Sequence, residues 1–360
     1  MRYLFLACLP DKAGSFGGAE RSIINLANWI ADNTTNEVFL ESVEGTGGAY
    51  KVSPNVVFHG NSMIYSSSIK IHYNMARNVV RAINNIKPDI VIGFWIHPLF
   101  YAIPYLLGKN IKMVYSARND PSRNYSIISR IMRWFVVRYA NGIVFQTNQA
   151  KDFFSKSIRE KSIVIPNPTY IRKGEYKLPN VRENKIVTVG RLELQKNHKM
   201  LINAFVKVRE VYPNMRLEIY GEGSQRYELE NLISELHLIS SVFLMGTCKD
   251  VFSKICSAKL FVLSSDFEGM PNALIEAMSL GVPSISTDCP CGGPRMLIQD
   301  GVNGFLVPVG DVNSLAEKII DILAMYDIKQ KEISAQGMKL LEILESGTIM
   351  KKWYRYMNNL

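Results

Sequence analysis

The chain has 360 residues, 47% of them apolar and 21% charged, and its formal net charge is +10 at pH 7. This length exceeds what one hydrophobic core usually supports, so we expect a globular protein of two domains. The basic surplus indicates an anionic partner: nucleic acid, an acidic membrane or a phosphate-bearing substrate. Neither the five cysteines nor the five histidines have the spacing of a metal site, and the cysteines are expected to be reduced thiols.

The N-terminal run 3–9, YLFLACL, predicts a buried strand, and it is too short for a signal peptide. Gly17 and Gly18 lie between this strand and a helical pattern, a position typical of phosphate-binding loops. The loop matches neither GxGxxG nor the GK[ST] of a P-loop, so dinucleotide oxidoreductases and P-loop NTPases lose their main sequence support.

The rest of the first half predicts further strands, at 37–43, 55–60, 89–94, 111–116, 142–147 and 162–166. The uncharged segment 90–107 has the length of a transmembrane helix. Its glycine and two prolines favour instead a buried strand, a loop carrying His97, and a helix from about Pro98. Arg118 and Asn119 follow the next strand, so we expect them near His97 at one edge of the sheet.

Residues 122–142 predict a basic amphipathic helix. At helical spacing Arg123, Arg130 and Arg138 fall within an arc of about 80°, with Arg133 beside it. The other faces are filled by Ile127, Ile128, Ile131, Trp134 and Phe135. Two interpretations stay open: the helix lies on an anionic membrane surface, or it packs its apolar side on the sheet and leaves the arginines in water.

The second half predicts strands at 185–190, 216–221, 241–246, 259–265 and 282–286, with helices such as 199–211 and 224–236 between them. Continuous apolar strands alternating with helices predict parallel sheets covered on both faces. The predicted fold class is therefore α/β, with two Rossmann-like doubly wound domains and a ligand cleft between the carboxyl ends of their strands. The expected boundaries are 1–167, 168–345 and a C-terminal segment, 346–360.

Two cations follow the strand at 185–190: Arg191 directly after it and Lys196 just before the next helix. The forked donors of arginine and the point charge of lysine suit a diphosphate. A basic loop that only faces water is the alternative.

Two glutamates frame the loop after the strand at 259–265. Eight residues rotate by about 80° on a helix, so Glu268 and Glu276 cannot share a helical face. We therefore place Glu268 on the loop and Glu276 about one turn inside a helix that begins near Pro271. Glu276 either binds a ribose diol or is an ordinary first-turn carboxylate, and its apolar neighbours favour the first interpretation.

These motifs carry a family resemblance. The Gly17–Gly18 loop, VGRLELQKNHKMLINAF, IYGEGSQRYELENLISEL and SSDFEGMPNALIEAMSLGVPSISTDCPCGGPRMLIQDGVNGFLVP together closely resemble the retaining GT-B glycosyltransferases of family 4. They are most similar to the branch that builds bacterial capsule, exopolysaccharide and O-antigen (lipopolysaccharide) chains. The resemblance is strong from about residue 185 to 320 and looser before it. YSARNDP (115–121) looks like that branch's SxRxDP element, with Ala117 where an acidic residue is common.

The resemblance implies a site for a nucleotide-sugar donor. Arg191 and Lys196 would stabilise the leaving diphosphate, and Glu276 would bind the ribose. The donor sugar would be held by Glu268 and the turn after it, which consists of Gly269, Met270, Pro271 and Asn272. Further donor contacts would come from Gly17 and Gly18 near the phosphates and from Thr247 and Val251 near the nucleobase.

The resemblance also implies the reaction. A hexose or N-acetylhexosamine would move from a nucleotide sugar to a lipid-linked or oligosaccharide acceptor, without metal or other cofactor and without nucleic acid. The family favours a UDP-sugar as the donor. His97 would hydrogen-bond the donor sugar or the acceptor, unless it is only structural, while Arg118 and Asn119 are acceptor-site candidates. The segment 346–360 would cross back onto the N-terminal domain, and the enzyme would be cytoplasmic, peripheral at the inner membrane.

Two rival functions share this architecture. Epimerases of the 2-epimerase type bind the same donor and need no acceptor, but they lack the Glu268/Glu276 helix in this context. Non-catalytic two-domain binding proteins are usually exported, and we find no export signal pattern at this N-terminus.

Overall fold

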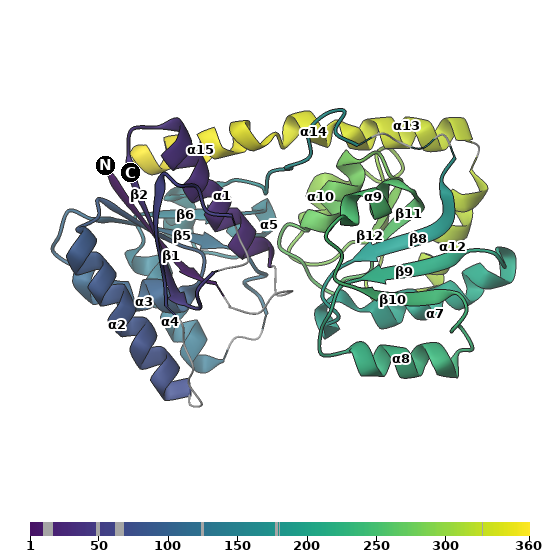
Figure 1. Ribbon diagram of the computed structural model, residues 1–360, viewed down its shortest axis with the longest axis horizontal. Helices are drawn as coiled ribbons and strands as arrows, with labels where there is room; N and C mark the ends of the chain where they lie inside the picture. Colours follow the sequence, from purple (N-terminus) through teal and green to yellow (C-terminus); the bar gives the residue numbers. More distant parts are fainter. Residues whose placement is uncertain are drawn as a thin grey trace. The chain divides into compact units, whose positions relative to one another are not determined.

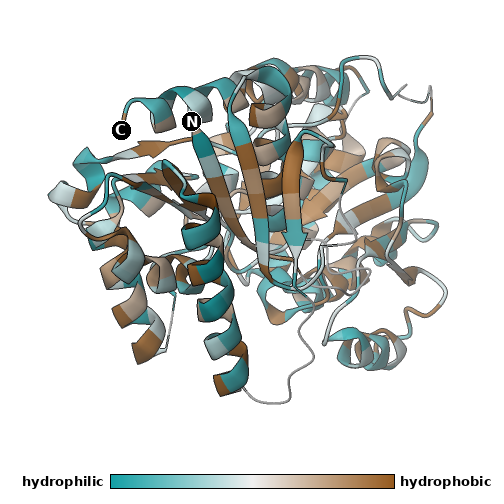
Figure 2. Ribbon diagram, turned by 60° about the vertical axis from the view of Figure 1, so that its left-hand side comes forward, coloured by the Kyte–Doolittle hydropathy of each residue, from teal (hydrophilic) through white to brown (hydrophobic). Residues whose placement is uncertain are grey.

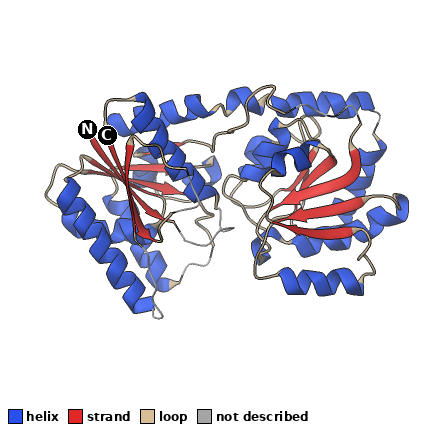
Figure 3. Cartoon of the chain, in the orientation of Figure 1, coloured by secondary structure: helices blue, strands red, loops and turns tan. Residues whose placement is uncertain are grey.

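The computed structural model describes residues 1–9, 17–47, 51–61, 68–123, 126–176, 179, 181–325 and 327–360. The chain divides into two compact units. We call Met1–Asn167 with Gly347–Leu360 the N-terminal unit, and Pro168–Ser346 the C-terminal unit. Each unit is a parallel β-sheet with helices on both faces (Figures 1 and 3), which confirms the predicted α/β fold.

In the N-terminal unit the sheet has the order β3-β2-β1-β4-β5-β6-β7, with parallel neighbours throughout. The strands are β1 (Arg2–Cys8), β2 (Glu37–Glu44), β3 (Val56–Gly60), β4 (Ile90–Gly93), β5 (Lys112–Ala117), β6 (Gly142–Phe145) and β7 (Ser162–Val164). Every strand predicted in this half is confirmed. The order reverses between β1 and β4, which is the switch point of a doubly wound sheet.

The helices of this unit are α1 (Gly18–Asn33), α2 (Ser68–Ile86), α3 (Ile96–Leu106), α4 (Ile127–Tyr139), α5 (Asn148–Asp152), α6 (Lys156–Glu160) and α15 (Ser346–Asn358). On one face of the sheet α2, α3 and α4 pack side by side, and α1 and α15 cover the other (Figure 1).

The uncharged segment 90–107 forms β4 and α3, as expected, but α3 begins at Ile96 rather than near Pro98. His97 is therefore in the helix and not in a loop before it. Pro98 is tolerated there because the first turn of a helix has no backbone acceptors for its N–H groups. Among the described helices, none combines the length and hydropathy needed to cross a bilayer.

In the C-terminal unit the sheet has the order β10-β9-β8-β11-β12-β13 and its neighbours are parallel. The strands are β8 (Glu183–Val189), β9 (Arg216–Tyr220), β10 (Val242–Gly246), β11 (Ala258–Leu263), β12 (Ser284–Thr287) and β13 (Phe305–Val307). Sequence analysis did not predict β13.

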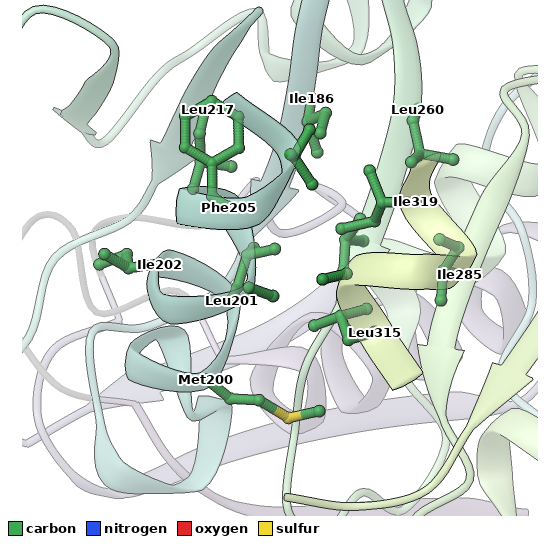
Figure 4. Close-up of a cluster of buried hydrophobic side chains, with 14 of the residues drawn as sticks. Ile186, Met200, Leu201, Ile202, Phe205, Leu217, Leu260, Ile285, Leu315 and Ile319 are labelled. Carbon is green, nitrogen blue, oxygen red and sulfur yellow. The ribbon is translucent and has the colours of Figure 1, made fainter. Parts of the chain in front are cut away.

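The helical segments of the C-terminal unit are η1 (Leu194–Lys196), α7 (His198–Val211), α8 (Arg226–Glu235), α9 (Val251–Cys256), α10 (Asn272–Ser279), α11 (Gly293–Leu297), α12 (Val312–Ala324), α13 (Asp327–Met338) and α14 (Leu340–Ile343). A large apolar core joins α7 and α12 to one face of the sheet. Figure 4 shows Leu201 and Phe205 of α7 and Ile319 of α12 beside the strand residues Ile186 and Leu260.

Hydropathy follows this layering. The strands are largely hydrophobic along their length, whereas the covering helices carry both hydrophobic and hydrophilic residues (Figure 2). A parallel sheet buried on both faces requires this pattern, which is why the apolar runs located the strands.

The C-terminal helix α15 is held in the N-terminal unit by aromatic side chains. Trp353 is buried and stacks on Phe94, with ring centroids 5.7 Å apart. The hydroxyl of Tyr356 accepts a hydrogen bond from the backbone N–H of Ile143 (2.8 Å) and donates one to the carbonyl of Lys161 (2.6 Å). The end of the chain is therefore part of the N-terminal core.

We expect Trp353→Ala to destabilise the protein by about 3–5 kcal/mol, the usual cost of deleting a buried tryptophan side chain. Denaturant unfolding would measure the change. Lys352→Ala, at an exposed position of the same helix, is the control. Equal unfolding midpoints for the two variants would show that α15 does not contribute to the core.

Candidate functional site

Two loops meet at the carboxyl edge of the C-terminal sheet. Because β8 and β11 are neighbouring parallel strands, the loops that follow them emerge side by side. We call residues 190–197 the Arg191 loop and residues 264–271 the Glu268 loop. The predicted charged residues Arg191, Lys196 and Glu268 all lie on this pair of loops.

Hydrogen bonds join the two loops. The side-chain amide of Gln195 donates to the carbonyl of Phe267 (2.9 Å), and the backbone N–H of Asp266 donates to the carbonyl of Gln195 (2.9 Å). The side-chain amide of Asn197, which is also the N-cap of α7, donates to Oδ1 of Asp266 (2.7 Å). The loops thus form one interlocked element rather than two independent segments.

An ion pair lies at the centre of this element. The ammonium of Lys196 contacts Oε1 of Glu268, and the hydroxyl of Ser265 donates to the same oxygen (2.7 Å). Both charged side chains are largely buried, and such a pair requires good geometry to offset its desolvation. A lysine ammonium has three donors, so pairing with Glu268 does not use its full capacity.

Arg191 is exposed at the end of β8, and the side chain of His198 hydrogen-bonds its backbone. Nε2 of this buried imidazole lies 3.2 Å from the carbonyl oxygen of Arg191, and since a carbonyl only accepts, Nε2 carries the proton. Burial, reinforced by the charge of Lys196, lowers the pKa of His198 to about 4, so the ring is neutral at pH 7. Sequence analysis missed this residue, although its position two residues after Lys196 at a helix start was a usable signal.

Glycines allow the loops to approach neighbouring backbone. A Cβ on Gly221, which has a φ of +146°, would lie 2.0 Å from the carbonyl oxygen of Gly190. A Cβ on Gly293 would lie 1.8 Å from the carbonyl oxygen of Gly269. Side chains at these positions would displace the loops that carry Arg191 and Glu268.

The segment Cys289-Pro290-Cys291 supports the backbone of Glu268. The N–H of Glu268 donates to the carbonyl of Pro290 (2.8 Å), and the N–H of Cys291 donates to the carbonyl of Glu268 (3.1 Å). Both residues are reduced, buried thiols. Burial, with the carboxylate of Glu268 nearby, raises the pKa of Cys289 to about 12, so this thiol stays protonated and acts as packing.

The predicted placement of the two glutamates is confirmed. Glu268 is on the loop, whereas Glu276 lies one turn inside α10, which begins at Asn272. The residue Glu276 is only 8% exposed and is surrounded in sequence by buried apolar residues. Met270 and Pro271 of the intervening turn are also buried. The backbone of Gly269 lies close to that of Gly293.

The residues predicted near the nucleobase lie at the same edge of the sheet. Thr247 follows β10, which is separated from β8 by β9 alone, and Val251 is the first residue of α9. Asp250 caps α9 by accepting a hydrogen bond from the N–H of Ser253 (3.3 Å).

In the N-terminal unit, Gly17 is the N-cap of α1 and Gly18 its first residue, while residues 10–16 of the predicted phosphate loop lie outside the described residues. His97 packs against His72, with ring centroids 5.1 Å apart, and Nδ1 of His72 lies 2.9 Å from the hydroxyl of Tyr101. Burial and the neighbouring His72 lower the pKa of His97.

Arg118 lies against two aromatic side chains at the end of β5. Its guanidinium lies 4.0 Å from the ring centroid of Phe94 and 5.7 Å from that of Trp353, and it donates to Oδ1 of Asn167 (2.5 Å). These contacts give Arg118 a packing role beside the predicted acceptor role. Asn119, next in the chain, is exposed.

The prediction for the basic helix needs two corrections. Arg123 is not on the helix, because Ser126 caps α4 by accepting a hydrogen bond from the N–H of Ser129; Arg123 instead pairs with Asp120 at 3.8 Å. Arg133 donates to the carbonyl of Pro121 (2.7 Å). The second correction concerns which apolar residues of α4 pack inward: the buried ones are Met132, Val136 and Val137. The exposed side carries Ile127, Ile128, Ile131 and Trp134 together with Arg130 and Arg138.

The chain matches the family model described as Glycosyl transferases group 1 over residues 174–347 and that of Glycosyltransferase Family 4 over residues 16–171. The protein is a member of family 4 of the glycosyltransferases, which act with retention of configuration. The predicted family resemblance is thereby confirmed over both units.

Relatives and solved structures agree with this assignment. The chain is 34% identical over 251 residues to an uncharacterized glycosyltransferase of Methanocaldococcus jannaschii, covering 62% of this chain and 61% of that protein. It is 22% identical, over 94% of both chains, to a Campylobacter jejuni α-1,4-N-acetyl-D-galactosaminyltransferase whose name gives a PP-undecaprenol-linked glycan as substrate. The crystal structure of Anabaena HepE in complex with UDP-glucose superposes with a TM-score of 0.83 at 21% identity and full coverage, and so shows the same GT-B fold.

The buried His198 predicts acid sensitivity. Since its pKa is about 4 in the folded chain and about 6.5 when unfolded, only the unfolded state takes up a proton between these values, and about 3 kcal/mol of stability is lost as the pH falls through that range. His198→Gln removes the titration and should flatten this part of the curve.

Free energies of unfolding at pH 7 and pH 4 would measure the effect. His237→Asn, which removes an exposed histidine of the same unit, should follow the wild-type pH dependence. A wild-type slope retained in His198→Gln would assign the acid sensitivity to other groups.

Proposed function

We propose that this protein transfers a hexose or N-acetylhexosamine from a UDP-sugar to a lipid-linked or oligosaccharide acceptor in surface polysaccharide synthesis. We place it in the cytoplasm, peripheral at the inner face of the inner membrane, where a water-soluble donor and a lipid-linked acceptor would meet. The observation that carries the proposal is the Lys196–Glu268 pair, fixed where the Arg191 loop meets the Glu268 loop. Two comparisons support the choice of substrates. The Anabaena protein binds UDP-glucose, and the name of the Campylobacter enzyme contains an undecaprenol-linked glycan.

The leaving diphosphate gains negative charge as the glycosidic bond breaks. Arg191 and Lys196 would stabilise that charge, and the interlocked loops hold their backbones in place before the reaction. Glu268 would accept hydrogen bonds from hydroxyls of the donor sugar, and Glu276 from the two ribose hydroxyls. The turn from Gly269 to Asn272 and the residues Thr247 and Val251 would complete the donor contacts.

The transfer itself needs no covalent intermediate with the protein. The acceptor oxygen bonds to the anomeric carbon as the bond from that carbon to the diphosphate oxygen breaks, and the same diphosphate oxygen takes the acceptor proton. The enzyme supplies positioning and charge stabilisation. His97, whose pKa is lowered, would be a neutral hydrogen-bonding partner for the donor sugar or acceptor, with Arg118 and Asn119 on the acceptor side and Gly17 and Gly18 near the phosphates.

Lys196→Ala should lower the rate of UDP release from a UDP-sugar, with or without a saccharide acceptor, by about 10²–10³-fold, because the protein loses one positive charge that stabilises the leaving diphosphate. A screen of UDP- and GDP-sugars by melting shift would first select the donor. Lys199→Ala removes an exposed lysine of the neighbouring helix α7 and should leave the rate unchanged.

A second variant separates catalysis from folding. Lys196→Ala alone leaves a buried carboxylate unpaired, whereas Lys196→Ala with Glu268→Gln removes both charges and should recover much of the melting temperature while remaining inactive. Activity that recovers with stability would contradict the catalytic role of Lys196. Product formed from the donor in the absence of any acceptor, other than hydrolysis, would favour an epimerase.

Glu276→Gln should weaken UDP binding by about 10- to 100-fold, the usual worth of hydrogen bonds to a charged group. The same substitution should scarcely affect 2′,3′-dideoxy-UDP, which lacks the hydroxyls that the carboxylate would bind. Calorimetric titration of both nucleotides into both proteins gives the coupling directly. Equal losses for the two nucleotides would rule out ribose recognition by Glu276.

A further inference from the structure

The positive charge of this protein is concentrated in one unit. The N-terminal unit has 22 lysine and arginine residues against 10 aspartate and glutamate residues, whereas the C-terminal unit has 20 against 22. The unit that carries the candidate diphosphate-binding cations therefore has no basic surplus. The basic surplus of the N-terminal unit therefore favours an anionic partner other than the donor diphosphate.

Helix α4 of that unit exposes large apolar side chains to solvent. Ile127, Ile131 and Trp134 are 75%, 51% and 59% exposed, and their spacing places them on one stripe of the helix. The helix packs inward through Met132, Val136 and Val137 instead. A contiguous exposed stripe of this kind marks a binding surface more often than an ordinary solvated helix.

Basic groups border this stripe. Arg130 and Arg138 are exposed on the same side of α4, and the sequence of the helix, IISRIMRWFVVRY, contains no acidic residue. At its C-terminal end the ammonium of Lys161 donates to the carbonyls of Arg138 (3.0 Å) and Ala140 (2.6 Å). The surface thus combines apolar side chains with a positively charged border.

The stripe is continuous with a hollow between α4 and the segment 154–158. This hollow has a volume of about 840 Å³, and its lining includes Ile131, Trp134, Arg138, Ser155, Ser157 and Ile158. Its wall therefore offers apolar side chains, an arginine and hydroxyl donors together, which are the groups that the boundary between lipid head groups and acyl chains requires.

We infer that the exposed face of α4, with this hollow, is a docking surface for an anionic phospholipid bilayer. Ile127, Ile131 and Trp134 would enter the acyl boundary, while Arg130 and Arg138 would bind lipid phosphates. This docking rests on the proposed function, because its purpose would be to bring the enzyme to a lipid-linked acceptor. A protein partner is the weaker alternative, because the exposed arginines favour a uniformly anionic surface.

Flotation of the full chain with vesicles tests the inference. We expect binding to an equal mixture of phosphatidylcholine and phosphatidylglycerol, little binding to phosphatidylcholine alone, and weakening as salt is raised. Arg130→Gln with Arg138→Gln, and separately Ile131→Ser with Trp134→Ser, should each weaken binding to the mixed vesicles by at least about tenfold. The matched controls Arg355→Gln and Ile239→Ser change exposed residues elsewhere and should bind as the wild type does.

The melting shift produced by UDP is measured on the same proteins to show that each is folded. Loss of vesicle binding with an unchanged UDP shift supports the docking surface. Wild-type protein that ignores anionic vesicles, or α4 variants that bind them normally, would overturn it. Self-association lost in Ile131→Ser with Trp134→Ser, without vesicle binding by the wild type, would overturn it in favour of a protein interface. Vesicle binding without any melting shift from UDP would support the docking surface and contradict the proposed function.

Discussion

The pairing of β8 with β11 in one parallel sheet is the constraint on which the candidate site depends. These strands are separated in sequence by β9 and β10, yet their neighbouring carboxyl ends bring the Arg191 loop and the Glu268 loop together. Only then can Lys196 and Glu268 form a largely buried ion pair. A charge pair in this environment is costly unless its surroundings are well ordered, and the hydrogen bonds between the loops supply that order.

Several features that have no direct chemical role follow from this constraint. Gly221 and Gly293 are required because backbone carbonyls approach where their Cβ atoms would lie. His198 is neutral and buried beneath Arg191, where it can hold a carbonyl without competing for the anion that the arginine would bind. Such supporting residues determine how accurately the charged groups are placed, which matters because electrostatic stabilisation depends on preorganised positions.

The two units differ in how they use charge. In the C-terminal unit the key lysine is paired with a glutamate and the numbers of acidic and basic residues nearly balance. In the N-terminal unit the basic surplus accompanies exposed apolar residues on α4. Balanced, buried charge suits specific recognition of one ligand, whereas unbalanced surface charge beside apolar side chains suits an extended anionic surface.

The amino-acid sequence by itself determined the described strands other than β13, the strand-end positions of Arg191 and Glu268, and the placement of Glu276 one turn inside α10. These features depend on local periodicity and on the rotation per residue of a helix. Tertiary structure alone decided three other features. The Lys196–Glu268 contact depends on the order of the strands in the sheet. The neutral state of His198 depends on its burial, and the side of α4 that faces inward depends on how the helix packs in the N-terminal unit. Periodicity shows that a helix has apolar sides but not which one its neighbours cover, since that choice belongs to packing between segments distant in sequence.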